Sequence, residues 1–427
     1  MIPSSEILQY ANALRDDMKQ WVLQGFEPQY GKKKEAFVAD ARWQAVCAAG
    51  TELWLDTGDL ASARKLWTRE FTALTTNNTL LNKEVQRGQY DDLVARTVAR
   101  IRELQPSIPQ SVLVLEVAFV LNAYHGLRLV EEFDAMVSVE EHTDLAHEVE
   151  LSVLYGQRFY EICPERFIVK LPLTPAGLLG MRKLRQEGVP INFTLGFSAR
   201  HNYVAARVGD PNYVNVFLGR LNAFTADSGL GNGDGVGERA TVASQEGLEA
   251  LRKSGSASTR QIAASMRTGD QVWTLAGTDL MTMPLGVAEG YHTSTEAPVQ
   301  GRGPRSEEFE LGLDAAEAAR LGFDRLWDIP ADLQSAVDAL VAGDLDNMSP
   351  DTLVKTLRDN GIADFFPEYD EDDLNTFRVD GKIPKLETWR SRLVERTVGL
   401  DSLMNMSGFY SFSADQKDLD DRIRGLL

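Results

Sequence analysis

Cysteine is nearly absent from this chain of 427 residues, which contains only Cys47 and Cys163. Two cysteines cannot form the disulfide framework of a small secreted protein, so a reducing, cytoplasmic compartment is the simplest expectation. Positive charge is also scarce, because 44 basic residues face 63 acidic ones and the net charge is −19. This balance argues against nucleic acid or an anionic membrane surface as the main partner.

Long apolar runs are missing as well. The most apolar stretch, residues 112–121, contains Glu116 and is about half as long as the ~20 residues of a membrane-spanning helix. We therefore expect no segment to cross a membrane, and residues 1–24 lack the unbroken apolar region of a signal peptide. The five histidines form no helical HExxH motif and have no cysteine at zinc spacing, so no metal site is expected.

From about residue 51, short apolar segments alternate with longer stretches of helical periodicity. This alternation is typical of βαβ units around a parallel sheet. Strands are predicted at residues 52–56, 71–77, 111–117, 167–172, 191–196 and 213–219, with weaker candidates at 252–259 and 279–284. Helices are predicted between them at residues 81–104, 142–162 and 175–187.

Eight strands in this span fit the length of a (β/α)₈ barrel, which is about 250 residues. The competing doubly wound sheet usually has a glycine-rich turn after its first strand, and here that turn contains one glycine, Gly58. We therefore expect an α/β protein: a (β/α)₈ TIM barrel over residues 51–305, with helical extensions at residues 1–50 and 306–427. Helices of the second extension are predicted at 331–342, 350–360, 385–406 and 414–427. They could cover the barrel mouth, form a dimer surface or extend the core, which leaves open whether the chain forms a homo-oligomer.

Polar side chains recur at or near the ends of the predicted strands. They are Asp56, Asn77, Glu116, Lys170, Thr194 and Arg220. In a barrel the carboxyl ends of the strands face one shared pocket. Because a sheet interior does not accept charge cheaply, six such residues indicate an active site at this end.

Lys170 is the central candidate, because the segment Phe-Ile-Val-Lys-Leu-Pro surrounds it with apolar residues. An apolar setting disfavours the charged ammonium form, and a neutral lysine amine can attack a carbonyl to form a Schiff base. Asp56 and Glu116 would supply carboxylates for proton transfer. The alternatives are a lysine that extends to solvent, an Asp56 that caps the helix near Leu60, and a Glu116 paired with a lysine.

Residues 254–260, Ser-Gly-Ser-Ala-Ser-Thr-Arg, precede a helix predicted to start near Gln261. Small residues and an arginine at a helix N-terminus form an anion site. The segment follows the predicted seventh strand, where barrels often bind phosphate. A flexible linker is the alternative interpretation.

Taken in order, these segments resemble the transaldolase family, which includes the fructose-6-phosphate aldolases. The resemblance covers roughly residues 50–290. Its motifs are LWLDTGD, TTNNTLL, VLEV, FIVKLPLTPAGLLGMRKLRQEGVPIN, INFTLGFS, NVFLGRL, SASTRQ and LAGTDLMTMP.

The resemblance implies a barrel enzyme without metal or organic cofactor that transfers a dihydroxyacetone unit between sugar phosphates, as in the pentose phosphate pathway. Lys170 would form the Schiff base, Asp56 would exchange the proton of the C4 hydroxyl, and Glu116 would act with Thr194 through a water. The substrate-binding residues that it implies are Asn77, Asn192, Asn215, Phe217, Arg220, Ser258 and Arg260.

The chain departs from the family pattern at two positions near the substrate. Asn78 stands where the family usually has proline, and Asn215 stands where transaldolases usually have serine. Phe217 is typical of transaldolases, whereas the free aldolases tend to have tyrosine there. Two alternatives to transfer therefore stay open: free aldol cleavage of the fructose-6-phosphate aldolase type, and a non-catalytic barrel that binds sugar phosphates.

Overall fold

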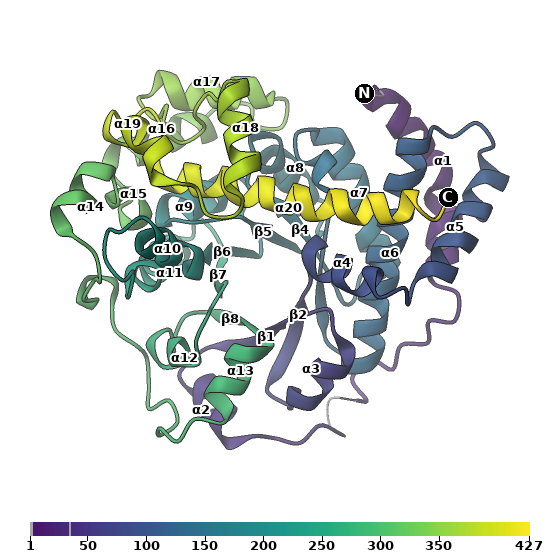
Figure 1. Ribbon diagram of the computed structural model, residues 1–427, viewed down its shortest axis with the longest axis horizontal. Coiled ribbons are helices and arrows are strands. Elements are labelled where there is room, and N and C mark those ends of the chain that lie inside the picture. The colour runs from purple at the N-terminus through teal and green to yellow at the C-terminus, as the bar shows by residue number, and fades with distance from the viewer. Residues whose placement is uncertain (1–2, 34–35) are drawn as a thin grey trace.

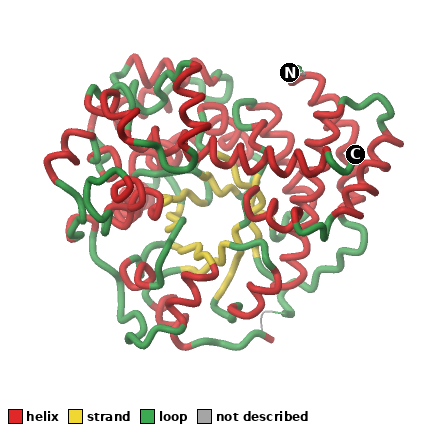
Figure 2. Tube along the Cα trace, viewed as in Figure 1, coloured by secondary structure: helices red, strands yellow, loops and turns green. Residues whose placement is uncertain are grey.

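A closed barrel of eight parallel strands lies at the centre of the molecule (Figures 1 and 2). The computed structural model describes residues 3–33 and 36–427. The strands follow one another around the barrel in chain order, and β8 pairs with β1, which confirms the predicted (β/α)₈ fold. They are β1 (Glu52–Asp56), β2 (Phe71–Thr75), β3 (Met136–Glu140), β4 (Phe167–Pro172), β5 (Ile191–Thr194), β6 (Tyr213–Phe217), β7 (Arg260–Ala264) and β8 (Leu280–Pro284).

Helices surround the barrel and continue beyond it (Figure 1). From the N-terminus to the last strand they are α1 (Ser4–Val22), α2 (Ala41–Ala48), α3 (Leu60–Leu66), α4 (Asn78–Gln86), α5 (Asp91–Leu104), α6 (Gln110–Phe133), η2 (Thr143–Leu145), α7 (Val149–Ile162), α8 (Pro175–Gln186), α9 (Ala199–Gly209), α10 (Leu218–Asp227), α11 (Val236–Ser254) and α12 (Asp270–Thr274). After β8 they are α13 (Leu285–His292), η3 (Ser306–Glu308), α14 (Ala315–Leu321), α15 (Asp324–Trp327), α16 (Ala331–Val341), α17 (Pro350–Asp359), α18 (Glu371–Asp380), α19 (Leu386–Val394) and α20 (Leu400–Arg424).

The unit β4–α8 shows how the sequence determines the local structure. All six residues of β4 are buried, as expected for a strand covered on both faces. Thr174 then caps α8 by accepting a hydrogen bond from the backbone N–H of Gly177, and Pro175 occupies the first turn. Strand register places Lys170 of β4 opposite Glu140 of β3 and Asn192 of β5. Polar side chains from neighbouring strands therefore meet at one level of the barrel.

Two of the predicted strands are wrong. Residues 111–117 belong to α6, and the third strand is β3, which begins at Met136. Residues 252–254 end α11, and the seventh strand begins only at Arg260, where a helix was expected. A short apolar run rich in valine and leucine fits a buried strand and a buried helix equally well, and α6 is buried over most of its length.

Glu116 therefore lies on a helix outside the barrel. Its two carboxylate oxygens accept hydrogen bonds of 2.7 and 2.6 Å from the guanidinium group of Arg158 on α7. The hydroxyl of Tyr155 donates a third, of 2.6 Å. All three side chains are buried. Glu116 thus joins α6 to α7 through an ion pair with an arginine, and the predicted placement at the barrel mouth is wrong.

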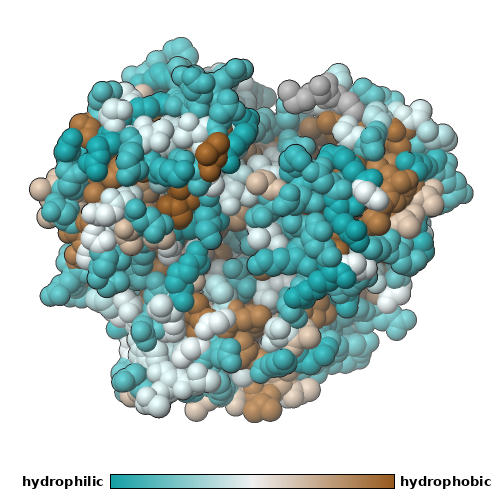
Figure 3. Space-filling model, viewed as in Figure 1, coloured by the Kyte–Doolittle hydropathy of each residue, from teal (hydrophilic) through white to brown (hydrophobic). Residues whose placement is uncertain are grey.

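One described helix, α6, is long and apolar enough to cross a membrane by length and composition alone. Its most apolar window is 89% buried inside the protein, which is what a core helix shows. The face of the molecule in Figure 3 is mostly hydrophilic, with apolar residues in small separate groups.

The last helix, α20, runs across the barrel end and is drawn in yellow in Figure 1. The side chain of Asn405 donates hydrogen bonds to the backbone carbonyls of Leu173 and Leu195, just beyond β4 and β5. Asp401 accepts hydrogen bonds from Arg200 and Ser198 on and before α9. Of the three arrangements left open for the extension, covering the mouth is therefore the one that α20 adopts.

Three helix boundaries differ from the prediction. Gly88, at φ +79°, separates α4 from α5, which were expected as one helix. Residues 395–399 separate α19 from α20, and α20 then continues without a break through residues 407–413. The third difference is α18, because no helix was predicted over residues 371–380; Asp370 caps this helix and three acids occupy its first turn. Acidic residues favour that position because of the helix dipole.

The ion pair of Glu116 predicts a large effect on stability. Replacing Glu116 by Gln should lower the free energy of unfolding by about 3–5 kcal/mol, because Arg158 is left buried without a counter-charge. Denaturant unfolding of the two proteins measures this difference. The exposed Glu103→Gln, which breaks a surface pair with Arg100, should cost at most about 1 kcal/mol. Wild-type stability with lost turnover in Glu116→Gln would contradict the structural role.

Candidate active site

A cavity of about 440 Å³ opens at the carboxyl end of the barrel. Its walls come from seven strands or the loops that follow them and from the C-terminal extension. The lining residues are Asp56, Thr75, Asn77, Thr79, Leu80, Lys83, Lys170, Asn192, Asn215, Phe217, Arg220, Ile262, Ala264, Ser265, Arg267, Thr282, Lys382, Ser411, Phe412 and Asp415. Seven residues predicted for the site are among them: Asp56, Asn77, Lys170, Asn192, Asn215, Phe217 and Arg220.

Lys170 is buried at the base of this cavity, with a side chain that is 5% exposed. Its Nζ donates a hydrogen bond of 3.4 Å to the backbone carbonyl of Thr76 and lies 3.8 Å from Oε1 of Glu140. The lysine therefore does not extend to solvent. An amine in this position can reach a carbonyl carbon of a molecule held in the cavity.

Two carboxylates flank Lys170: Glu140 is buried, and Asp56 is half-buried at the wall of the cavity. Burial raises the pKa of Asp56, against the opposing effects of Lys170 and of the Thr75 hydroxyl, which donates a 2.7 Å hydrogen bond. Burial likewise raises the pKa of Glu140, and Lys170 offsets part of that change. The raised pKa of each carboxyl group lies closer to neutral pH. A group whose pKa is near the working pH transfers protons most effectively.

Glu140 is the acidic residue that the sequence analysis missed. It ends β3, in the segment Met-Val-Ser-Val-Glu, where apolar and polar residues alternate. That alternation, followed by the helical pattern of α7, was the available signal. Glu140 occupies the position beside the lysine that had been predicted for Glu116.

Amide and hydroxyl side chains form the floor between these groups. Asn192 accepts a hydrogen bond from Asn215 and donates one to Ser138. Thr194, two residues further along β5, is fully buried and is not among the residues that line the cavity, and its Oγ1 has no hydrogen-bond partner in the described part of the chain. Asn77 faces the cavity and also caps α4 by accepting from the backbone N–H of Leu80. These groups can donate to and accept from the hydroxyls of a sugar.

The rim beyond β6 carries an arginine without a counter-ion. Arg220 is 7% exposed, and its Nη1 has no hydrogen-bond partner among residues 3–33 and 36–427. Burial, together with the nearby charge of Arg267, lowers the pKa of Arg220 to about 10. Its guanidinium carbon lies 5.4 Å from the ring centre of Phe217 and 5.2 Å from that of Phe412. A buried, unpaired cation in an open cavity is suited to bind an anion.

The predicted phosphate ligands Ser258 and Arg260 lie elsewhere. Ser258 donates to Asp210, and Arg260 pairs with Glu52 at 2.7 Å, at the amino-terminal end of the strands. This part of the prediction is wrong because the segment precedes β7 instead of following it. Ser265 and Arg267, which follow β7 in the sequence Ala-Ser-Met-Arg, line the cavity instead. Neither Arg220 nor Arg267 forms an ion pair within the described residues.

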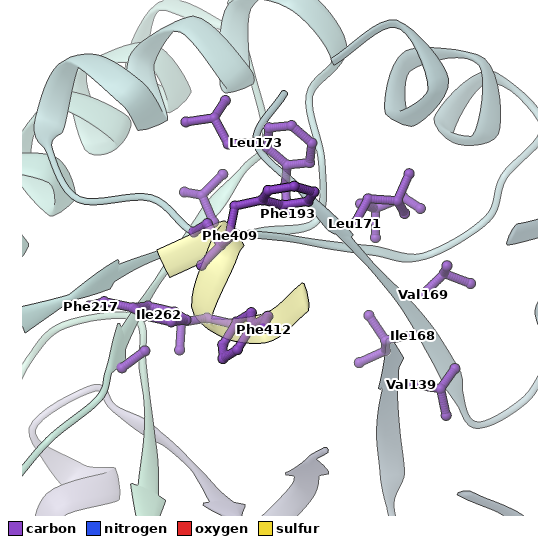
Figure 4. Packing of buried hydrophobic residues seen from close by; sticks show 14 of the residues in the cluster. Val139, Ile168, Val169, Leu171, Leu173, Phe193, Phe217, Ile262, Phe409 and Phe412 are labelled. Atoms are coloured by element: carbon purple, nitrogen blue, oxygen red, sulfur yellow. The ribbon is translucent and has the colours of Figure 1, made fainter. Parts of the chain in front are cut away.

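The C-terminal extension supplies part of the wall. Phe412 of α20 lies with its ring centre 5.8 Å from Nζ of Lys170, and Figure 4 shows it beside Phe217 and Ile262. Asp415, one turn further, accepts a hydrogen bond from Thr79 at the start of α4. A Cβ at Gly408 would lie 3.0 Å from Leu195, so this glycine lets α20 approach the barrel. Nothing in the local sequence marks these residues as part of a site, because only the tertiary fold brings them to the mouth.

A group of potential metal ligands occurs beside the same helix. Atoms of His142, Asp144 and Asp420 lie within 4.8 Å of one another. His142 already uses both ring nitrogens, because Nδ1 accepts from the backbone N–H of Asp144 and Nε2 bonds to Asp420. This contact joins α20 to the loop after β3, and we assign no metal to it.

The fold and this cavity define a class: (β/α)₈ barrels with a buried lysine between carboxylates and an unpaired arginine at the rim. The profile of the family described as Transaldolase/Fructose-6-phosphate aldolase matches residues 53–367. The chain belongs to that family.

Curated relatives support the same assignment. Transaldolase of Xanthomonas campestris pv. campestris (strain B100) is 30% identical over 234 residues, which cover 53% of this chain and 71% of that protein. Transaldolase of Xanthomonas euvesicatoria pv. vesicatoria (strain 85-10) is 29% identical over the same shares. Transaldolase of Nostoc sp. (strain PCC 7120) is 25% identical over 279 residues, which cover 64% of this chain and 79% of that protein.

The two ends of β7 give a matched pair of variants. Arg267→Ala should weaken binding of fructose 6-phosphate about 10- to 100-fold, because hydrogen bonds to a charged group are lost. Arg260→Ala, at the opposite end of the same strand, should leave binding close to wild type. Isothermal titration calorimetry measures both dissociation constants. Equal weakening in the two variants would contradict the corrected placement of the anion site.

Proposed function

We propose that this protein transfers a dihydroxyacetone unit from a ketose phosphate to an aldose phosphate through a Schiff base on Lys170. The observation that carries the proposal is the buried amine of Lys170, which lies between the carboxylates of Asp56 and Glu140 in a cavity that an unpaired arginine also lines. A protein that only binds sugar phosphates does not need a buried amine beside two carboxylates. Family membership supports the same chemistry.

The reaction would begin when Nζ of Lys170 adds to the C2 carbonyl of the ketose, and loss of water leaves an iminium ion. Asp56 would then take the proton of the C4 hydroxyl. The electrons of the C3–C4 bond move into the iminium, an aldose phosphate leaves, and an enamine stays on the lysine. C3 of this enamine attacks the aldehyde of the acceptor, whose oxygen receives the proton back from Asp56. Addition of water releases the new ketose phosphate and the free amine.

Glu140 takes the role that had been predicted for Glu116. Its Oε1 lies 3.8 Å from the amine, so it can exchange protons, through a water held by Thr194, while the carbinolamine forms and loses water. Arg220, Ser265 and Arg267 would hold the phosphate, and Asn77, Asn192 and Asn215 would orient the hydroxyls. Since the chain has a net charge of −19, phosphate affinity must come from these local cations.

Two aromatic rings favour transfer over free cleavage. Phe217, which the resemblance associates with transaldolases, and Phe412 both lie beside Arg220 at the mouth. Neither ring can donate a hydrogen bond to a water molecule, so the enamine is kept from protonation until the acceptor arrives.

Reduction with borohydride tests the Schiff base directly. Incubation with fructose 6-phosphate and borohydride should add the mass of the reduced ketose to Lys170, as read by peptide mass spectrometry. Lys170→Met should give no adduct. An unmodified Lys170 with every phosphorylated ketose tried would favour a binding barrel, and turnover without any aldose acceptor would favour a free aldolase.

Asp56→Asn separates formation of the Schiff base from cleavage. The amide cannot take the C4 proton, so cleavage should slow by about 10²–10⁴-fold while trapping on Lys170 persists. Single-turnover release of glyceraldehyde 3-phosphate measures the cleavage step. Cleavage at the wild-type rate would remove Asp56 from the mechanism.

Phe412→Ala should open the mouth to water. We expect free dihydroxyacetone to increase about tenfold relative to the transferred product, a change of ~1.4 kcal/mol between the two barriers. Chromatographic analysis of the products gives this ratio. Phe409→Ala on the same helix is the control, because Phe409 packs toward Phe193 and Leu173 (Figure 4). An unchanged ratio in Phe412→Ala would show that the ring does not control access of water.

A further inference from the structure

The carboxylate of Glu140 touches a helix that follows a different strand. Its Oε2 accepts a hydrogen bond of 3.1 Å from the backbone N–H of Asn78. Asn78 is the first residue of α4, a helix of nine residues capped by Asn77. The N–H groups of a first helical turn have no partner within the helix, and they carry the positive end of its dipole. Such an N–H group usually donates to water or to a capping side chain. Here the N–H of Asn78 donates to the carboxylate of Glu140 instead.

Side chains fix the position of Asn78 relative to β3. Asn78 is 1% exposed, and its Nδ2 donates a 3.1 Å hydrogen bond to the backbone carbonyl of Glu141. Nδ2 of Asn122 on α6 lies 3.5 Å from Oδ1 of Asn78 and 2.6 Å from the backbone carbonyl of Glu140. The start of α4 is thus joined to the end of β3 from both sides.

The other charged or titratable groups around Glu140 lie on β1, β4, α7, α10 and the loop after β3. Lys170 on β4 faces Oε1, Asp56 on β1 adds a negative charge, and Arg220 on α10 a positive one. His142 after β3 and Tyr155 on α7 line a small cavity that Glu140 shares. Among the described residues, a hydrogen bond to Oε2 comes from Asn78 alone.

We propose that Asn78 is a positioning residue, whose backbone N–H holds Glu140 as a charged carboxylate with its other oxygen turned toward Lys170. The inference rests on the proposed function, because it assigns the proton exchange at the amine to Glu140. The motif that the sequence resembles usually has proline at this position, and proline has no N–H to donate.

The backbone conformation before Asn78 is compatible with the substitution that tests this bond. Proline is favoured at the first position of a helix, and the residue before it must be extended. Asn77 has φ −157° and ψ 170°, which is extended backbone. Asn78→Pro therefore removes the N–H while α4 is retained, whereas Asn78→Ala removes the side chain and keeps the N–H.

The pH dependence of cleavage should distinguish the two variants. Losing a hydrogen bond to the charged form raises the pKa of Glu140, so the acid limb of kcat in Asn78→Pro should move to higher pH by about one unit. Asn78→Ala should keep the acid limb at its wild-type position. An unmoved limb in Asn78→Pro, or an equal shift in both variants, would overturn the proposal.

A second measurement needs no variant of Asn78. With ¹⁵N-labelled asparagine, the amide proton of Asn78 in the wild-type protein should change its chemical shift with the titration of Glu140, and Glu140→Gln should abolish that change. A shift that does not depend on pH would overturn the proposal even if Asn78→Pro does not fold. Borohydride trapping on Lys170 distinguishes failure of the proposed function from failure of this inference. Loss of trapping refutes the proposed function. Normal trapping with an Asn78 amide shift that does not depend on pH refutes only this inference.

Discussion

An amine and two carboxylates lie close together at the carboxyl end of the barrel, and the rest of the site depends on this arrangement. Alone, any of these charges would be expensive to bury, because an unpaired ion loses its hydration without compensation. Together, Lys170, Asp56 and Glu140 offset one another through distances that the strand register determines. Burial raises the pKa of both carboxyl groups, which brings them closer to the point where they can give or take a proton. The barrel provides the rigidity, since its strands cannot slip without moving every side chain to the other face.

The arginines at the cavity mouth show that the local charge there differs from the net charge of the protein. The protein as a whole is strongly acidic, yet Arg220 and Arg267 have no carboxylate at ion-pair distance in the described residues. Most arginines on the outside are paired, for example Arg64 with Glu132 and Arg182 with Asp346. Arg220 and Arg267 therefore differ from most other arginines because they have no carboxylate partner. This missing partner indicates an anion site more strongly than the number of arginines does.

Much of the barrel could be predicted from the sequence, because buried parallel strands are short, apolar and regularly spaced. Lys170 and Asp56 could be identified for the same reason, as polar residues that end such strands. The location of Glu116 was predicted wrongly because a buried helix and a buried strand have the same composition over seven residues. The locations of Ser258 and Arg260 were predicted wrongly because the start of β7 determines at which end of the barrel a residue lies. Phe412 and Asp415 could not be predicted, since their role depends on where α20 lies in space.

The contact between Thr79 and Asp415 joins positions that are 336 residues apart in the chain. Contacts of such long sequence separation are slow to form, because the intervening chain must first lose much of its freedom. During synthesis, the barrel strands leave the ribosome well before α20. In a nascent chain the mouth of the barrel therefore stays uncovered until α20 docks onto it.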